Sequence, residues 1–337
     1  MPVSEENKRM KKYLSPLMLF GAALIWGCAF SAQKAISGLE PYAVGFWRSV
    51  LAAAFLCPVI ALFDHFTHSG RKLISRRGLD FTRTEVIGGV ACGLVLGGAI
   101  ALQQFGISGG TDAGKASFIT ALYVVMVPVF GLLFRQKTKL NVWISVVIAI
   151  IGFYLLCIKG DFTMEFSDSL ILISSVVFAA HILIIGYFSP KVDGIRMSLI
   201  QFVVCAVVNL IPSLIFESTT FTISLVGQNI FPLVVIGVGS SGIGYTLQIL
   251  GQRTTEDTAA ATIILSTESV IGAIIAAIAF GERMEVREAI GCAIIFCAVL
   301  LSQLDPIGAI KKRRERKSAS GAGQEPPGDN GKNDADK

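Results

Sequence analysis

The side chains in this sequence that could take part in chemistry are few, and they lie within long apolar stretches. Glu268 occurs in the run Leu-Ser-Thr-Glu-Ser, Arg48 lies about two turns into its apolar stretch, and His181 is the only histidine inside one. Polar groups are costly in hydrocarbon, so an ionisable residue at such a position is a candidate functional residue. A carboxylate there could bind an ammonium group or a proton, a guanidinium could bind an anion, and an imidazole could titrate near neutrality.

Uncharged polar and aromatic residues in the same stretches could complete a binding site. The candidates are Trp26, Trp47, Gln103, Tyr123, Tyr245 and Gln248. Each has a structural alternative, because a polar side chain within a membrane also stabilises helix pairs by interhelical hydrogen bonds of ~1 kcal/mol. The same alternative applies to Gln201 and Asn209.

The motifs of several enzyme classes are missing from the sequence. It contains no HExxH or GxGD motif and no nucleotide-binding P-loop. Its seven cysteines fall in apolar runs without a CxxC pair, so they are expected to be packing residues. The sequence therefore predicts no catalytic residue, no metal site and no cofactor.

The composition predicts an all-α integral membrane protein. Of the 337 residues 53% are hydrophobic and only 16% charged, against roughly 25% charged in soluble domains, and the mean hydropathy is +0.66. The charges separate apolar runs of about 20 residues, the length that crosses a ~30 Å hydrocarbon core. The runs predict ten transmembrane helices, near residues 14–35, 41–63, 85–107, 112–134, 140–158, 168–188, 195–216, 230–252, 256–280 and 286–304.

Two of these stretches contain several closely spaced glycines. Gly89, Gly93 and Gly97 recur every four residues, which predicts a close-packed helix face. Four glycines between positions 237 and 244 predict a pliable eighth helix. The polar segment 305–337 is expected to be a disordered cytoplasmic tail, and residues 1–13 a basic cytoplasmic N-terminus.

The basic residues predict the orientation in the membrane. With the N-terminus in the cytoplasm, nearly all loop lysines and arginines lie on the cytoplasmic side, including the clusters at 8–12, 71–77 and 311–317. Both chain ends are then cytoplasmic, which requires an even number of spans. The net charge of +5 is explained by these clusters and predicts no nucleic-acid partner. Lys34, Arg48 and Lys115 lie toward the outer half, which favours a carboxylate-bearing or zwitterionic substrate.

The two halves of the sequence resemble each other. A shift of 145 residues superposes Gln103 on Gln248, Asp112 on Asp257 and Tyr123 on Glu268. Five spans per repeat is an odd number, so the repeats, residues 14–158 and 168–304, must have opposite orientations. Inverted repeats are typical of secondary transporters with one central substrate site, which would place Glu268 opposite Tyr123.

Several motifs resemble the EamA-type transporters of the drug/metabolite transporter superfamily. They are Leu-Ile-Trp-Gly-Cys-Ala-Phe at 24–30, Phe-Trp-Arg-Ser-Val-Leu-Ala-Ala at 46–53, Ala-Ser-Phe-Ile-Thr-Ala-Leu-Tyr-Val-Val-Met-Val-Pro at 116–128 and Phe-Gly-Glu-Arg-Met at 280–284. By this resemblance Trp26, Arg48, Tyr123 and Glu268 match commonly retained positions. The sequence departs from the family pattern at Ser269, where proline is frequent, and at Gln136 and Lys137, where a Glu-Arg pair is frequent.

The resemblance implies ten helices in two inverted halves and transport of metabolites, amino acids or drugs. We therefore expect a secondary transporter in the cell membrane that works by alternating access, is not an enzyme, and has as partners the lipid bilayer and a small-molecule substrate, with proton coupling at Glu268 as an option. A channel, a non-transporting structural or regulatory protein and a membrane-embedded enzyme remain the alternatives.

Overall fold

A computed structural model describes residues 5–66, 80–133, 138–157, 165–217, 223–255, 257–280 and 286–304. Within these ranges every regular element is helical. The expected tail at 305–337 and most of the basic clusters lie outside the described residues.

The helices follow the apolar runs of the sequence closely. The first half contains α1 (Glu5–Lys34), α2 (Pro41–Phe66), α3 (Arg83–Ser108), α4 (Ala113–Ala121), α5 (Tyr123–Leu133) and α6 (Leu140–Cys157). The second half contains α7 (Phe166–Phe188), η1 (Ser189–Lys191), α8 (Gly194–Phe216), α9 (Ile223–Gln228), α10 (Ile230–Val234), η2 (Val235–Gly244), α11 (Tyr245–Arg253), α12 (Thr258–Leu265), α13 (Glu268–Phe280) and α14 (Val286–Leu304).

The length and hydropathy of these helices are those of a multi-pass membrane protein. Eight helical stretches of the described residues are long and apolar enough to cross a bilayer. Two more apolar helices, Leu140–Leu155 and Ala289–Ser302, are shorter. Large apolar side chains are widely exposed, for example Leu133, Phe216 and Ile278 at 74% or more, as expected of a surface that faces lipid.

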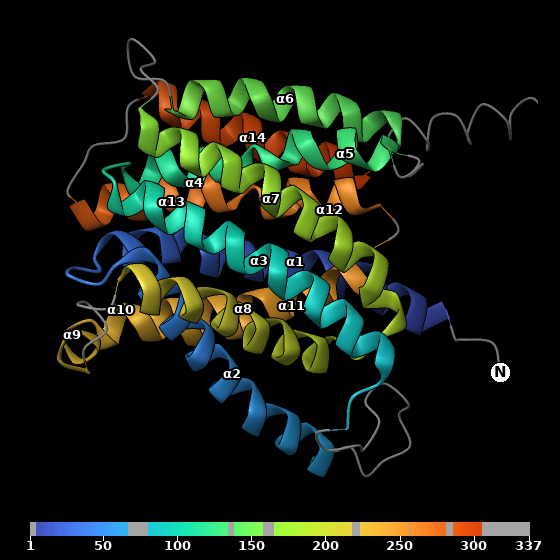
Figure 1. Ribbon diagram of the computed structural model, residues 1–337. Helices are drawn as coiled ribbons and strands as arrows, with labels where there is room; N and C mark the ends of the chain where they lie inside the picture. Colours follow the sequence, from blue (N-terminus) through green and yellow to red (C-terminus); the bar gives the residue numbers. More distant parts are fainter. Residues whose placement is uncertain are drawn as a thin grey trace, which may run out of the picture.

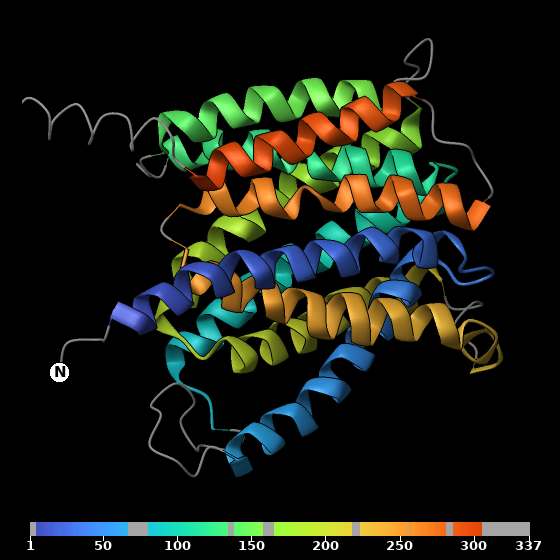
Figure 2. The same cartoon turned by 180° about the vertical axis from the view of Figure 1, so that it is seen from behind.

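The helices form one bundle in which they run side by side (Figures 1 and 2). The pair α6 and α14 packs along one edge, and α2 lies at the opposite edge against α8. Between these edges α1 and α3 occupy the middle, where α1 packs on α13, α11 and η2, and α3 packs on α7 and α8.

Two apolar stretches are broken where the sequence predicted one continuous helix. The helix over 112–134 is interrupted at Leu122, and the helix over 256–280 is interrupted at Ser266 and Thr267. In the second break the hydroxyls of Ser266, Thr267 and Ser269 donate to the carbonyls of Ile263, Ile264 and Ser266 at 2.7–2.8 Å. Such side chains compete with the helical backbone bonds. Leu122 and Thr267 are 145 residues apart, the same offset as the repeat.

The expected pliable helix is also irregular. Residues Val235–Gly244, which contain the four glycines, form the π-helical segment η2 between α10 and α11. The wide π turn is rare and occurs often at functional sites. The short helix α9 and the extension of α1 back to Glu5, within the segment 1–13, were not predicted.

The glycine face of α3 provides the predicted close contact. A Cβ atom on Gly89 would come within 2.6 Å of the Ile200 side chain, and one on Gly93 within 2.6 Å of the Gln201 carbonyl and the Val204 side chain. The backbones of α3 and α8 can therefore approach closely only because these positions carry no side chain.

Candidate functional site

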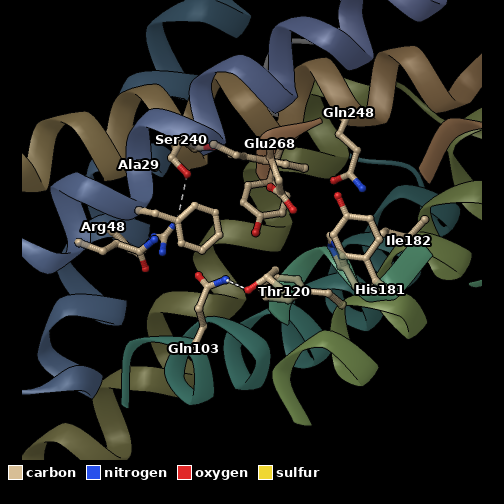
Figure 3. Close-up of a pocket in the computed structure, with 15 residues that line it drawn as sticks. Ala29, Arg48, Gln103, Thr120, His181, Ile182, Ser240, Gln248 and Glu268 are labelled. Carbon is tan, nitrogen blue, oxygen red and sulfur yellow. Dashed lines mark hydrogen bonds between the residues drawn. The ribbon is translucent and has the colours of Figure 1, made fainter. Parts of the chain in front are cut away.

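A pocket lies among the helices in the middle of the bundle, and most of its polar lining is buried (Figure 3). Its water-accessible cavity measures about 30 Å³, which is room for only a few water molecules. Fifteen residues line it: Trp26, Ala29, Phe30, Gln33, Arg48, Gln103, Thr120, Tyr123, Phe178, His181, Ile182, Ser240, Tyr245, Gln248 and Glu268.

Eight of the candidate residues named from the sequence line this one pocket, and each is less than a tenth exposed; they are Trp26, Arg48, Gln103, Tyr123, His181, Tyr245, Gln248 and Glu268. Their placement brings them together, while their role in substrate binding stays a prediction. The sequence did not single out Gln33, Thr120 or Ser240 as site residues. Gln33 could have been recognised as a further polar residue inside an apolar stretch.

Arg48 projects from α2 toward η2. Its Nε donates to Ser241 Oγ at 3.0 Å and its NH2 donates to Ser240 Oγ at 3.2 Å. The side chain is 3% exposed. In the part of the chain that the structure describes no carboxylate pairs with it, so the buried guanidinium is held by two neutral hydroxyls only.

Glu268 and Tyr123 occupy matching places at the two helix breaks. Tyr123 is the first residue of α5 and Glu268 is the first residue of α13. The two side chains lie within hydrogen-bonding range of each other. Tyr123 Oη and Glu268 Oε1 are buried and have no hydrogen-bond partner of good geometry among the described residues, and no described cation pairs with Glu268.

Aromatic rings and an imidazole form another part of the wall. Trp26 donates from Nε1 to the Ser240 carbonyl at 3.1 Å and packs on Tyr245 with 4.7 Å between ring centroids. Tyr245 also contacts the ring of His181, at 5.7 Å. His181 Nε2 lies 2.9 Å from Gln201 Oε1, so Gln201 supports the pocket without lining it.

The two glutamines of the repeat differ in their bonding. Gln103 donates from Nε2 to Thr120 Oγ1 at 3.0 Å, whereas Gln248 Oε1 has no partner among the described residues. In Figure 3 Arg48 lies at one side of the pocket, Gln248 and His181 at the other, and Glu268 between them. Two further candidates, Trp47 and Asn209, lie outside the pocket. Asn209 donates to the Gly97 and Cys205 carbonyls.

The two outer lysines do not belong to this pocket. Lys34 Nζ donates to the carbonyl of Ile107, in the last turn of α3, and to those of Gly110 and Thr111, which follow the helix. Lys115 Nζ pairs with Asp168 at 2.6 Å. Two of the three cations that favoured a carboxylate-bearing substrate therefore have structural partners, and that inference now depends on Arg48 alone.

The charges of the pocket break the symmetry of the repeats. Arg48 is the eighth residue of α2, and Gln201 is the eighth residue of α8. Likewise Glu268 has Tyr123 as its counterpart. One half thus provides the cation and the other half the carboxylate, and neither charge is repeated.

Comparison with known proteins identifies the family. The model of the EamA-like transporter family matches twice, over residues 14–158 and 165–304. A protein named "Uncharacterized transporter" from Archaeoglobus fulgidus is 26% identical over 301 residues, which cover 88% of this chain and 87% of the relative. A solved crystal structure, described only as that of a protein, shares the fold with a TM-score of 0.68 at 15% identity and covers 86% of this chain and 96% of its own. The family matches together span most of the sequence, and the chain belongs to the EamA-like transporter family.

Proposed function

We propose that the protein is a secondary transporter that binds a small zwitterionic solute in the central pocket and moves it across the cell membrane by alternating access. The observation that carries this proposal is the pair of buried opposite charges, Arg48 and Glu268, which line one pocket and have no ionic partner in the described residues.

The electrostatics favour a solute with one cationic and one anionic group. Leaving a charge buried without a partner costs several kcal/mol in proteins, so a ligand that neutralises both charges gains that free energy on binding. An ammonium group would meet Glu268, and a carboxylate would meet Arg48. In the empty pocket Glu268 can instead bind a proton, which offers a route to proton coupling.

The architecture that we propose consists of ten transmembrane helices in two inverted five-helix repeats, residues 14–158 and 168–304. The helix contacts support it, because exchange of the two halves converts the contacts of one half into those of the other, while the pairs α2–α8 and α6–α14 are converted into themselves. The contacts of α3 with α7 and α8 correspond to those of α11 and η2 with α1 and α2. The contact of α1 with α13 corresponds to that of α7 with α4 and α5.

The size of the pocket favours a transport cycle with moving helices. A cavity of about 30 Å³ is smaller than the several hundred Å³ of ordinary ligand sites, so a solute can enter only if helices separate. The broken helices α4–α5 and α12–α13 and the π segment η2 are the irregular elements at the pocket. Discontinuous helices of this kind surround the substrate sites of many transporters.

The experiment is uptake into proteoliposomes with a panel of labelled zwitterions, anions and cations. We expect saturable uptake of a zwitterion by the wild type. Glu268→Gln should raise KM about 10- to 100-fold, since a hydrogen bond to a charged group is worth about 1.5–3 kcal/mol, and should flatten the pH dependence. Glu40→Gln, at an exposed glutamate outside the pocket, is the control. Unchanged KM and pH dependence in Glu268→Gln would remove the assignment.

A further inference from the structure

Two carboxylates at matching positions hold opposite ends of the same helix pair. Asp64 is the twenty-fourth residue counted from the start of α2, and Glu217 is the twenty-fourth counted from the start of α8. The helices α2 and α8 come from different halves of the chain and pack against each other. We call the end of the bundle at which α3 and α8 begin the N-terminal face. Asp64 lies at this face, and Glu217 lies at the opposite face.

The contact at the N-terminal face is a buried ionic network. Arg196, in the first turn of α8, is 1% exposed, and its NH2 lies 3.0 and 2.8 Å from the two carboxylate oxygens of Asp64. Its NH1 donates to Asp193 at 2.7 Å. Glu85 of α3 accepts from the backbone N–H of Asp193 at 3.3 Å. The network therefore joins α2 and α3 of the first half to the start of α8.

The contact at the opposite face is a carboxylate that caps the N-terminus of a helix. The two oxygens of Glu217 accept from the backbone N–H groups of Tyr42 at 2.9 Å and Ala43 at 2.8 Å. These N–H groups belong to the first turn of α2, where they have no partner within the helix. A carboxylate at this end also interacts favourably with the helix dipole.

Both contacts are closed in this structure, and the pocket between them is nearly filled. Arg48 lies on α2 between Ala43 and Asp64, so α2 links the two contacts to the pocket. Because α2 carries Arg48 and packs on α8, a movement of α2 away from α8 at one face would displace a wall of the pocket on that side. Other contacts join the two halves, for example Ser15 with Thr255, Ser37 with Asn229 and Lys115 with Asp168. None of these residues belongs to α2 or α13, which carry the two charges of the pocket.

We propose that the Asp64–Arg196 pair and the Glu217 cap on α2 are the two gates of the transport site. The first closes the N-terminal face, which the basic residues predict to be cytoplasmic, and the second closes the opposite face. The inference rests on the proposed function, because only a protein that opens to both faces needs two gates. The network of the first gate has to be hydrated when it opens, while the second exposes one carboxylate and two backbone N–H groups.

The test follows access to the pocket from each side of the membrane. A reporter cysteine replaces Ala29, a small residue of the pocket lining, in a chain whose native cysteines are changed to serine or alanine. A membrane-impermeant thiol reagent is applied to sealed vesicles of each orientation. We expect Asp64→Asn to raise the labelling rate from the N-terminal face about fivefold or more, without an increase from the other face. Glu217→Gln should have the opposite sidedness.

A matched control and a milder variant keep the test decisive. Asp257→Asn makes the same chemical change at a carboxylate that caps α12 of its own half, through Ala259 and Ala260 at 3.0 and 3.4 Å, and should change neither rate. Arg196→Lys keeps the charge but loses the double contact to Asp64, so it replaces Asp64→Asn if that variant fails to give monodisperse protein. Equal effects on both faces, or no effect in any gate variant, would overturn the proposal. The labelling assay needs no substrate, so the two proposals can fail separately. Labelling that changes at one face in a protein that transports no solute would contradict the proposed transport function. Transport with unchanged labelling in the gate variants would contradict the proposed gates.

Discussion

Arg48 differs from the other cations of the outer half in what it contacts. Its guanidinium binds two serine hydroxyls of η2 and lines the pocket, whereas Lys34 binds backbone carbonyls at and just beyond the end of α3. The substrate charge is therefore expected to depend on Arg48 and not on the lysine.

A pair of substitutions separates these two roles. Arg48→Gln removes the cation from the pocket and should raise KM for a zwitterion at least tenfold, equivalent to about 1.4 kcal/mol. Lys34→Gln should leave KM unchanged and lower the stability by about 1 kcal/mol or less, since the site is partly exposed. Transport kinetics and thermal unfolding in detergent measure the two effects. Equal changes in KM for both variants would contradict this division.

The sequence indicated which polar residues would lie together, and the reason is physical. Polar side chains are so unfavourable in lipid that those in apolar stretches must face inward, and Trp26, Arg48 and Glu268 do line the same pocket. The sequence could not separate Lys34 and Lys115 from Arg48, because the carbonyls and the carboxylate that hold the lysines come from distant segments.

At the scale of the helices, the α3–α8 contact depends on the absence of side chains. A Cβ on Gly93 would come within 2.6 Å of the Gln201 carbonyl, while a Cβ on Gly98 of the same helix would have no heavy atom within 4 Å. Alanine at Gly93 therefore tests the helix contact, and alanine at Gly98 is its matched control.

Gly93→Ala should destabilise the protein by about 1–3 kcal/mol, the usual cost of overpacking. Gly98→Ala should be neutral or stabilising by up to about 1 kcal/mol, because alanine is the better helix former. Unfolding in detergent, followed by circular dichroism, compares the variants. Loss of stability in Gly98→Ala as large as in Gly93→Ala would show that the interface is not the cause.

The apolar runs predicted where helices lie but not where they break. Their pattern is the same whether a span is continuous or divided, so the interruptions at Leu122 and at Ser266–Thr267 were missed. The hydroxyl run Ser266, Thr267 and Ser269 was the available signal in the second half. In the first half Leu122 carries no comparable signal.

At the scale of the whole molecule, the proposed inverted repeats fix the two chain ends on one face. An even number of spans returns the chain to the side where it began, and the basic clusters predict that this side is cytoplasmic. Single cysteines at Ser4 and Ser318, in a chain without its native cysteines, should both react with an impermeant reagent from the cytoplasmic side only. Reaction of the two ends from different sides would contradict the ten-helix architecture.

The central claim is that the pocket is open to one side at a time, and counterflow tests it most directly. Proteoliposomes are loaded with a high concentration of the unlabelled zwitterion found by the uptake panel, and entry of the labelled solute is followed with and without this load. The binding site of an alternating-access carrier turns from the inner to the outer side with unlabelled solute bound, and it then exchanges this solute for labelled solute. We therefore expect saturable uptake and a transient accumulation of labelled solute inside the vesicles above its outside concentration. Flux that rises linearly with concentration, unaffected by the internal load and accompanied by single-channel currents, would contradict the account.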